Sequence, residues 1–142
     1  MSRSVLVLGA NRGIGLNLCK QFAKHGWKVA GTIRQQTEGG ASVEELKEIT
    51  KDIFVLDYTD EHSIIQAAKY YGTRPLDVLI NCAGVEPQPV KWQNHSAEIL
   101  LEKFQIMAVG PFLASKHFFP ALEKSKGKII NISSDMGSIS RG

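Results

Sequence analysis

The sequence of 142 residues has only two cysteines, no long apolar run and no strong excess of charge of either sign. Cys19 and Cys82 stand in dissimilar contexts, outside any C-x-x-C pair, which favours reduced packing residues over a disulfide or metal ligands. The longest apolar stretches, such as residues 5–10 and 108–115, are much shorter than the roughly 20 residues that span a bilayer. The first residues also lack the apolar core and cleavage site of a signal peptide, so we expect no membrane segment and a cytoplasmic protein.

The charge pattern and the histidines argue against two further classes of function. Lysines and arginines number 17 against 14 aspartates and glutamates, a net charge of +3, and the basic residues are scattered along the chain. The sequence therefore does not indicate nucleic acid as a partner. The four histidines have no H-x-x-x-H or comparable spacing, so we expect no metal site. The length predicts a single domain over residues 1–142.

Apolar runs alternate with amphipathic segments, which predicts an α/β fold with a doubly wound parallel sheet of the Rossmann type. The spacing of Ile14, Leu18 and Phe22 predicts the buried face of the first helix. A long helix over residues 96–122 is expected to be interrupted or bent near Gly110 and Pro111. The predicted strands are residues 4–8, 27–33, 53–56, 76–80 and 128–132. Helix caps are expected at Ser42, Asp60 and Ser96, and helix ends at Gly26 and Gly72.

The last predicted strand is followed only by a loop over residues 133–142. A closing helix is missing there, so we expect one face and the outer edge of this strand to lack their usual cover. The pattern indicates that the C-terminal part of the fold is missing from the chain. The alternative is a complete small domain of five strands with a frayed tail.

Three glycines join the first predicted strand to the first helix: Gly9, Gly13 and Gly15. We call residues 9–15 the glycine turn. Such a turn lets the backbone approach a phosphate closely, and the amides that begin the helix point toward the anion. Its position between a buried strand and an amphipathic helix predicts dinucleotide binding. The spacing G-x-x-x-G-x-G differs from G-x-G-x-x-G, and no G-K-S/T follows, which excludes a P-loop.

The chain resembles the short-chain dehydrogenases/reductases, and within them the C-factor and carbonyl-reductase-like group. Five motifs occur in the family's order and at its spacings: GANRGIG at 9–15, LDYTD at 56–60, LINCAG at 79–84, AVGPF at 108–112 and INISSDMGSI at 130–139. The resemblance covers essentially the whole chain, and it implies that the five strands lie in the order 3-2-1-4-5. It implies hydride transfer between a nicotinamide and a small carbonyl or alcohol substrate, and a homo-oligomer if the protein is full length.

The resemblance also implies a set of coenzyme contacts. Arg34 ends the second predicted strand where a carboxylate would select NAD(H), so Arg34 and Arg12 indicate a clamp for the 2′-phosphate of NADP(H). NADP(H) is thus the preferred coenzyme, and NAD(H) is a possible one. The alternative interpretation of Arg34 is a solvated cation in a loop. Asp57 matches the family residue that contacts the adenine, and the alternative is a simple turn or cap residue. Residues 81–84 match the family's N-N-A-G segment, with Cys82 in place of the second asparagine. The expected coenzyme residues are Gly9, Asn11, Arg12, Gly13, Ile14, Gly15, Arg34, Asp57, Tyr58, Asn81, Cys82, Ala83 and Gly84.

The resemblance implies one catalytic residue in this chain, Ser134, which would hold the substrate oxygen. The alternative is that Ser133 and Ser134 are loop hydroxyls. Met107 stands where the family usually has a catalytic asparagine, and the chain ends before the region of the Tyr-x-x-x-Lys motif. We therefore expect the coenzyme-binding part of an NADP(H)-dependent oxidoreductase. The alternative is a catalytically inactive nucleotide-binding, interaction or signalling protein, which Met107 slightly favours.

Overall fold

The computed structural model describes residues 2–11, 13–35, 40–82 and 92–132 of the chain. Within these residues, five strands form one sheet in the order β3-β2-β1-β4-β5, and every neighbouring pair is parallel. This topology confirms the predicted Rossmann-type fold, including its strand order. The strands are β1 (Ser4–Leu8), β2 (Lys28–Ile33), β3 (Ile53–Val55), β4 (Val78–Asn81) and β5 (Lys128–Asn131).

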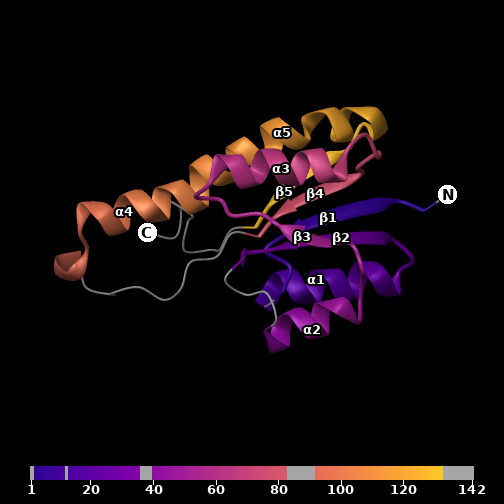
Figure 1. Cartoon of the computed structure of the whole chain (residues 1–142), viewed down its shortest axis with the longest axis horizontal. Helices are drawn as coiled ribbons and strands as arrows, with labels where there is room; N and C mark the ends of the chain where they lie inside the picture. Colours follow the sequence, from indigo (N-terminus) through magenta and orange to yellow (C-terminus); the bar gives the residue numbers. More distant parts are fainter. Residues whose placement is uncertain (1, 12, 36–39, 83–91, 133–142) are drawn as a thin grey trace, which may run out of the picture.

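Helices cover both faces of the sheet, as Figure 1 shows. The helices α1 (Gly13–Lys24) and α2 (Ala41–Lys47) lie on one face. On the other face lie α3 (Glu61–Tyr71) and α5 (Gly110–Ser125), while α4 (Ala97–Phe104) extends away from the sheet. A short 3₁₀ helix, η2 (Trp92–Asn94), precedes α4.

Strand β1 lies at the centre of the sheet and is buried on both faces. Leu6 and Leu8 belong to the apolar cluster beneath α3 and α5, and Val5 and Val7 belong to the cluster beneath α1 and α2. All four side chains are almost fully inaccessible to solvent. This burial explains the continuous aliphatic run in the sequence, because a strand covered on both faces has no polar face.

Two of the three predicted helix caps are confirmed, and one is wrong. The side chains of Asp60 and Ser96 accept hydrogen bonds from the backbone amides of His62 and Ile99, so both are N-caps. Ser42, however, lies inside α2, whose N-cap is Gly40 in an extended conformation. The Ser42 hydroxyl instead accepts a hydrogen bond of 3.2 Å from the side-chain amide of Asn11. The Ser42 hydroxyl, which the local sequence assigns to helix capping, therefore bonds a residue far away in the sequence.

The predicted bend of the long helix takes the form of a π-helix, η3 (Gln105–Val109), between α4 and α5. Pro111 lacks a backbone N–H, so it cannot donate to the carbonyl four residues earlier. A wider turn before Gly110 accommodates this missing donor, as π-bulges do. The helix then continues to Ser125, three residues beyond the predicted end.

Strand β5 is the least covered strand of the sheet. All four of its residues are exposed, and Ile129 and Ile130 each retain 42% of their accessible surface. The expectation that this strand lacks its usual cover is confirmed for the part of the chain that the structure describes.

Candidate functional site

The candidate site lies at the edge of the sheet where the strands end, which we call the carboxyl edge. The glycine turn follows β1 at this edge, and Asn81 and Cys82 end β4 beside it. Gly9 adopts φ of 82°, a left-handed conformation that favours glycine. A Cβ on Gly9 would lie 2.9 Å from the carbonyl oxygen of Cys82. The turn therefore packs directly against the end of β4.

The glycine turn also packs tightly onto the helix that it begins. A Cβ on Gly15 would lie 2.0 Å from the carbonyl oxygen of Gly9, so a larger residue does not fit. Gly13 is different: it has φ of 58°, and an added Cβ would meet no atom within 4 Å. The turn is thus closed toward the protein and open toward solvent at the start of α1.

The start of α1 is accessible and carries no acidic residue in its first turn. Ile14 is 59% exposed, so its predicted place on the buried face of α1 is wrong. The buried residues are instead Gly15, Leu16 and Cys19, with Leu18 and Phe22 only partly buried. The first amides of a helix lack intrahelical partners and lie at the positive end of its dipole. This end of α1 can therefore accept an anion.

Hydrogen bonds fix the turn to its neighbours. The Gly9 amide donates to the Thr32 hydroxyl at 3.2 Å, and the Ala10 amide donates to the Thr32 carbonyl at 2.9 Å. Asn11 is buried, and its side-chain amide donates to Ser42 in α2. These bonds hold residues 9–11 of the turn against β2 and α2.

Two charged residues predicted for the site also lie at the carboxyl edge. Arg34 directly follows β2 and is exposed. Asp57 follows β3 and is half-buried. One Asp57 carboxylate oxygen accepts hydrogen bonds from the amide and the hydroxyl of Thr59, at 2.8 and 2.7 Å. Asp57 therefore begins a turn, and its predicted contact with the adenine stays a prediction.

Sequence reasoning missed a chain of hydrogen bonds at this edge. The Tyr58 hydroxyl donates to the Asn81 side-chain oxygen at 2.7 Å. The Asn81 side-chain amide in turn donates to the Asn131 side-chain oxygen at 2.9 Å. Burial raises the pKa of the Tyr58 phenol far above its usual value, and Cys82 nearby adds a smaller effect. The phenol therefore keeps the proton that it donates. Periodicity and motif spacing carry no signal for partners so far apart in sequence.

Both cysteines are free thiols within the described structure, as predicted. Cys19 is fully buried in α1, and burial raises the pKa of its thiol to about 12. Cys82 is half-buried, and burial raises its thiol pKa as well. These thiols resist ionisation, so they pack as small apolar groups.

Four predicted residues lie outside the described residues: Arg12, Ala83, Gly84 and Ser134. Across the ranges that the structure does describe, there is no group of three or more histidine, cysteine, aspartate or glutamate residues that could hold a metal. Over those same ranges, no helix has both the length and the apolar character needed to cross a membrane.

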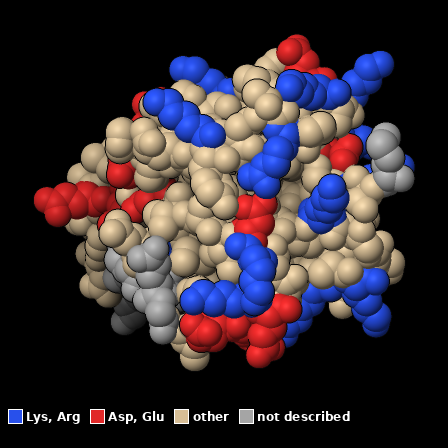
Figure 2. Space-filling model, turned by 45° about the vertical axis from the view of Figure 1, so that its right-hand side comes forward, with Lys and Arg blue, Asp and Glu red and all other residues tan. Residues whose placement is uncertain are grey.

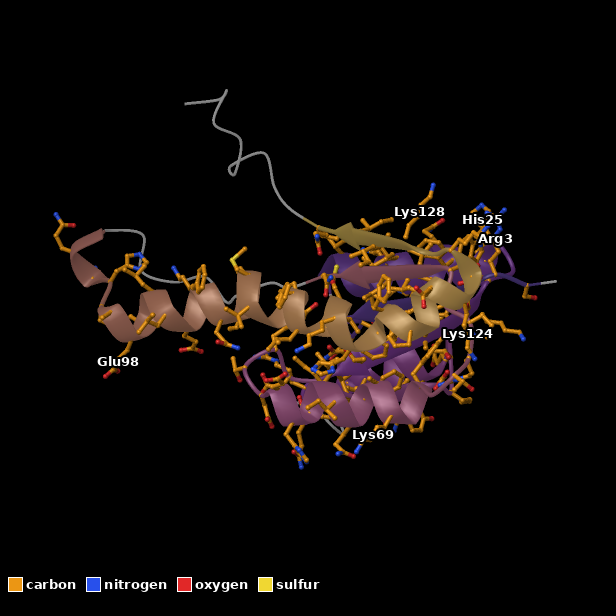
Figure 3. The ribbon with its side chains drawn as sticks, turned by 90° about the horizontal axis from the view of Figure 1, so that it is seen from above. Arg3, His25, Lys69, Glu98, Lys124 and Lys128 are labelled. Carbon is orange, nitrogen blue, oxygen red and sulfur yellow. The ribbon has the colours of Figure 1, made fainter. Side chains whose placement is uncertain are left out.

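The charges of the surface are mixed in sign. Figure 2 shows lysine and arginine side chains interspersed with aspartate and glutamate on one face. Figure 3 shows Arg3, His25 and Lys128 at the amino edge of the sheet, which is the edge opposite the glycine turn. These side chains therefore lie away from the candidate site.

Comparisons with known proteins converge on one family. The family model described as short chain dehydrogenase matches residues 3–141. A (+)-neomenthol dehydrogenase of Arabidopsis thaliana is 32% identical over an alignment that includes 96% of this chain and 55% of the relative. A serine 3-dehydrogenase of Agrobacterium fabrum is 33% identical, with 94% of this chain and 54% of the relative covered. The chain thus spans about half the length of the curated relatives that it matches.

A solved structure agrees with this result. The NADPH-bound carbonyl reductase from chicken fatty liver superposes on 98% of this chain with a TM-score of 0.85 and 33% sequence identity. The chain covers 62% of that structure.

Proposed function

Because the chain belongs to the short-chain dehydrogenase family, we propose that it carries the coenzyme-binding part of an NADP(H)-dependent oxidoreductase. The reaction would interconvert a small carbonyl compound and its alcohol, and the bound nicotinamide would supply or accept the hydride. The observation that carries this proposal is the glycine turn. At Gly9 and Gly15 an added side chain would collide with the backbone of Cys82 and of Gly9, so the turn is closed toward β4 and α1. At Gly13, where α1 begins, the turn is open.

This geometry fits the pyrophosphate of a dinucleotide. The backbone of Gly9, Asn11 and Gly13 would lie along it, with Gly15 allowing the helix to approach. Ile14, exposed beside the turn, would border the ligand. We also keep Arg12 as a contact on the strength of the family motif. The amides that begin α1 would then bind the charge without competition from an acidic side chain.

The preference for NADP(H) rests on Arg34. A carboxylate at the end of β2 would bond the ribose hydroxyls and repel a 2′-phosphate, and this chain has an exposed arginine there. A guanidinium can form paired, charge-assisted hydrogen bonds with a phosphate. The NADPH bound in the chicken carbonyl reductase supports the same choice. NAD(H) would bind more weakly, because it cannot use the arginine in this way.

The remaining predicted residues complete the proposal. Asp57 would contact the adenine, with Tyr58 adjoining it in the chain. Asn81, Cys82, Ala83 and Gly84 would lie along a ribose of the coenzyme. Ser134 would hold the substrate oxygen as the catalytic serine. Its support is the family motif at 130–139 and the course of β5, which leads toward the carboxyl edge.

We propose that the protein acts in the cytoplasm as a homo-oligomer. The free thiols of Cys19 and Cys82 fit a reducing compartment. Large apolar side chains are exposed along α4, η3 and α5, and such surface commonly marks a protein interface. They are Leu100, Leu101, Phe104, Met107, Phe112 and Phe119.

A second candidate function is nucleotide binding without turnover. Met107 lies in η3, where the family usually carries an asparagine, and a thioether is a weak hydrogen-bond acceptor with no donor. A water that needs an amide partner would not be held there. This observation favours a protein that keeps the coenzyme site but has lost catalysis.

Coenzyme titration tests the proposal directly. We expect the 142-residue chain to bind NADPH saturably, and more tightly than NADH, in a calorimetric or fluorescence titration. Arg34→Ala should weaken NADPH by about 1.5–3 kcal/mol, the contribution of a charge-assisted hydrogen bond, and change NADH little. Lys28→Ala is the matched control, because it removes one exposed cation from the opposite end of the same strand. Equal losses for both coenzymes would disprove the arginine clamp.

A further inference from the structure

The chain of hydrogen bonds through Tyr58, Asn81 and Asn131 crosses the carboxyl edge. Tyr58 follows β3, Asn81 ends β4 and Asn131 ends β5. The two bonds, of 2.7 and 2.9 Å, use the oxygen and the nitrogen of the same Asn81 side-chain amide. Asn81 is 2% exposed and Tyr58 is 9% exposed, so water cannot readily replace Tyr58 as a partner. The orientation of the Asn81 amide is therefore set from both sides.

Asn81 is also a backbone junction. Its carbonyl accepts a hydrogen bond from the Ile132 amide at 3.0 Å, and the next amide, of Cys82, donates to the Leu8 carbonyl at 3.1 Å. The ends of β1, β4 and β5 are thus joined at residues 81 and 82. The Cys82 carbonyl is the group that lies closest to the Gly9 position of the glycine turn. A displacement of Asn81 would therefore move the adjacent Cys82, whose carbonyl packs against the glycine turn.

Tyr58 makes a second set of contacts with the bent helix. A Cβ on Gly110 would lie 2.4 Å from the Tyr58 Cβ, so the helix packs closely against this tyrosine. The Gln105 side-chain amide donates to the Tyr58 carbonyl at 3.2 Å. Tyr58 thus has contacts at both ends of η3 while its hydroxyl bonds the end of β4.

We propose that Tyr58 is a positioning residue of the coenzyme site, acting through Asn81 and Asn131 to hold the end of β4 against the glycine turn. The inference rests on the proposed function, because it assumes that a dinucleotide binds at that turn. Tyr58 orients the Asn81 amide, and Asn131 fixes its other end. Together they hold the Cys82 carbonyl beside the Gly9 position of the glycine turn.

Two tyrosine variants give a matched test. Tyr58→Phe removes the hydroxyl that bonds Asn81, and Tyr71→Phe removes a buried hydroxyl that donates to the Pro75 carbonyl at the amino edge. Both lose one hydrogen bond of a buried phenol, so urea unfolding should show a similar loss of stability. We expect NADPH affinity to fall about three- to tenfold in Tyr58→Phe, the range for one neutral hydrogen bond, and to stay unchanged in Tyr71→Phe.

A second readout needs no coenzyme. Cys82 adjoins Asn81, so loosening the end of β4 should make the Cys82 thiol react several times faster with iodoacetamide in Tyr58→Phe than in the wild type. The rate should be unchanged in Tyr71→Phe, and Cys19, fully buried in α1, serves as the internal control. Mass spectrometry of the labelled peptides measures both rates.

Asn131→Ala removes the bond between Asn81 and Asn131 at an exposed position of β5. It replaces Tyr58→Phe as the test if that variant does not fold. It should change affinity and Cys82 reactivity in the same direction. In the double variant the two losses should be less than additive, because each single change already frees the Asn81 amide. Failure of the wild type to bind NADPH would overturn the proposed function and this inference with it. Binding by the wild type, with Tyr58→Phe equal to Tyr71→Phe in affinity and Cys82 reactivity, would overturn the positioning role alone.

Discussion

Replacing Gly15 with alanine tests whether the contact between the glycine turn and α1 is as close as the geometry indicates. The new Cβ would lie 2.0 Å from the Gly9 carbonyl oxygen, 3.0 Å from the Gly9 carbonyl carbon and 3.2 Å from the Ala10 Cα. Ordinary contact between carbon and oxygen begins at about 3.3 Å, so the two groups would have to separate by more than about 1 Å. The Gly9 amide is bonded to Thr32, which ties the carbonyl to the sheet.

The expected cost follows from two opposing effects. In an open helix position, alanine is favoured over glycine by about 1 kcal/mol. Overpacking in a closed site costs about 1–3 kcal/mol, and a clash with backbone lies at the upper end of that range. We therefore expect Gly15→Ala to lower the free energy of unfolding by about 2 kcal/mol and to abolish measurable NADPH binding. Urea unfolding and a coenzyme titration measure the two effects.

Two glycine controls separate stability from binding. Gly13→Ala and Gly26→Ala place a Cβ in open space at φ of 58° and 84°, which should cost about 1–2 kcal/mol each. Gly26 lies beyond the far end of α1, so its variant should bind NADPH normally, while Gly13→Ala should weaken binding. A Gly15→Ala variant that is more stable than the wild type, and that binds NADPH as well, would refute the close contact.

Three further predictions concern the remainder of the fold. Asp60→Ala removes the N-cap bond of 3.0 Å to the His62 amide and should cost about 1 kcal/mol in urea unfolding, whereas no change would show that the cap contributes nothing. Phe118→Ala should cost about 3–5 kcal/mol because Phe118 is 1% exposed, while its neighbour Phe119, at 53%, should tolerate alanine within about 0.5 kcal/mol; similar losses would contradict the assigned core. Burial raises the pKa of the Cys19 thiol from 9.0 to about 12, so this thiol ionises at lower pH in the unfolded chain, and its contribution to stability is lost as the pH rises between these values. The slope approaches about 1.4 kcal/mol per pH unit for that one group, and it should be absent from the unfolding profile of Cys19→Ala.

The strands and the glycine turn could be predicted because their signals are local, whereas the strand order follows from the resemblance to a known family. The apolar run of β1 and the glycines after it lie within twelve residues, and each reflects a steric or burial requirement of its own position. The boundaries are less exact: β2 begins at Lys28, one residue later than predicted, and the Trp27 amide instead donates to the Phe22 carbonyl in α1 at 3.0 Å. The alternation of segments nevertheless identified every strand that the structure describes.

The misplaced residues share a physical cause. Ile14 has the helical spacing of a buried residue but lies in the first turn of α1, where Gly15 and Leu16 are the buried residues and Ile14 is exposed. Ser42 has the chemistry of a cap but bonds Asn11, a residue 31 positions away. Tyr58 and Asn131 meet through Asn81 across 23 and 50 positions. Such contacts depend on how strands are brought together, and periodicity does not encode that.

The central place of β1 has a consequence for the order in which the chain can fold. Its side chains are buried on both faces, and its two edges pair with β2 and β4. The partner β2 follows within about thirty residues, but β4 ends only at Asn81. Until that residue leaves the ribosome, one edge of the most apolar strand stays unpaired and able to associate with other chains. Nascent chains that stop before β4 should therefore aggregate or recruit chaperones, whereas chains that extend past it should not.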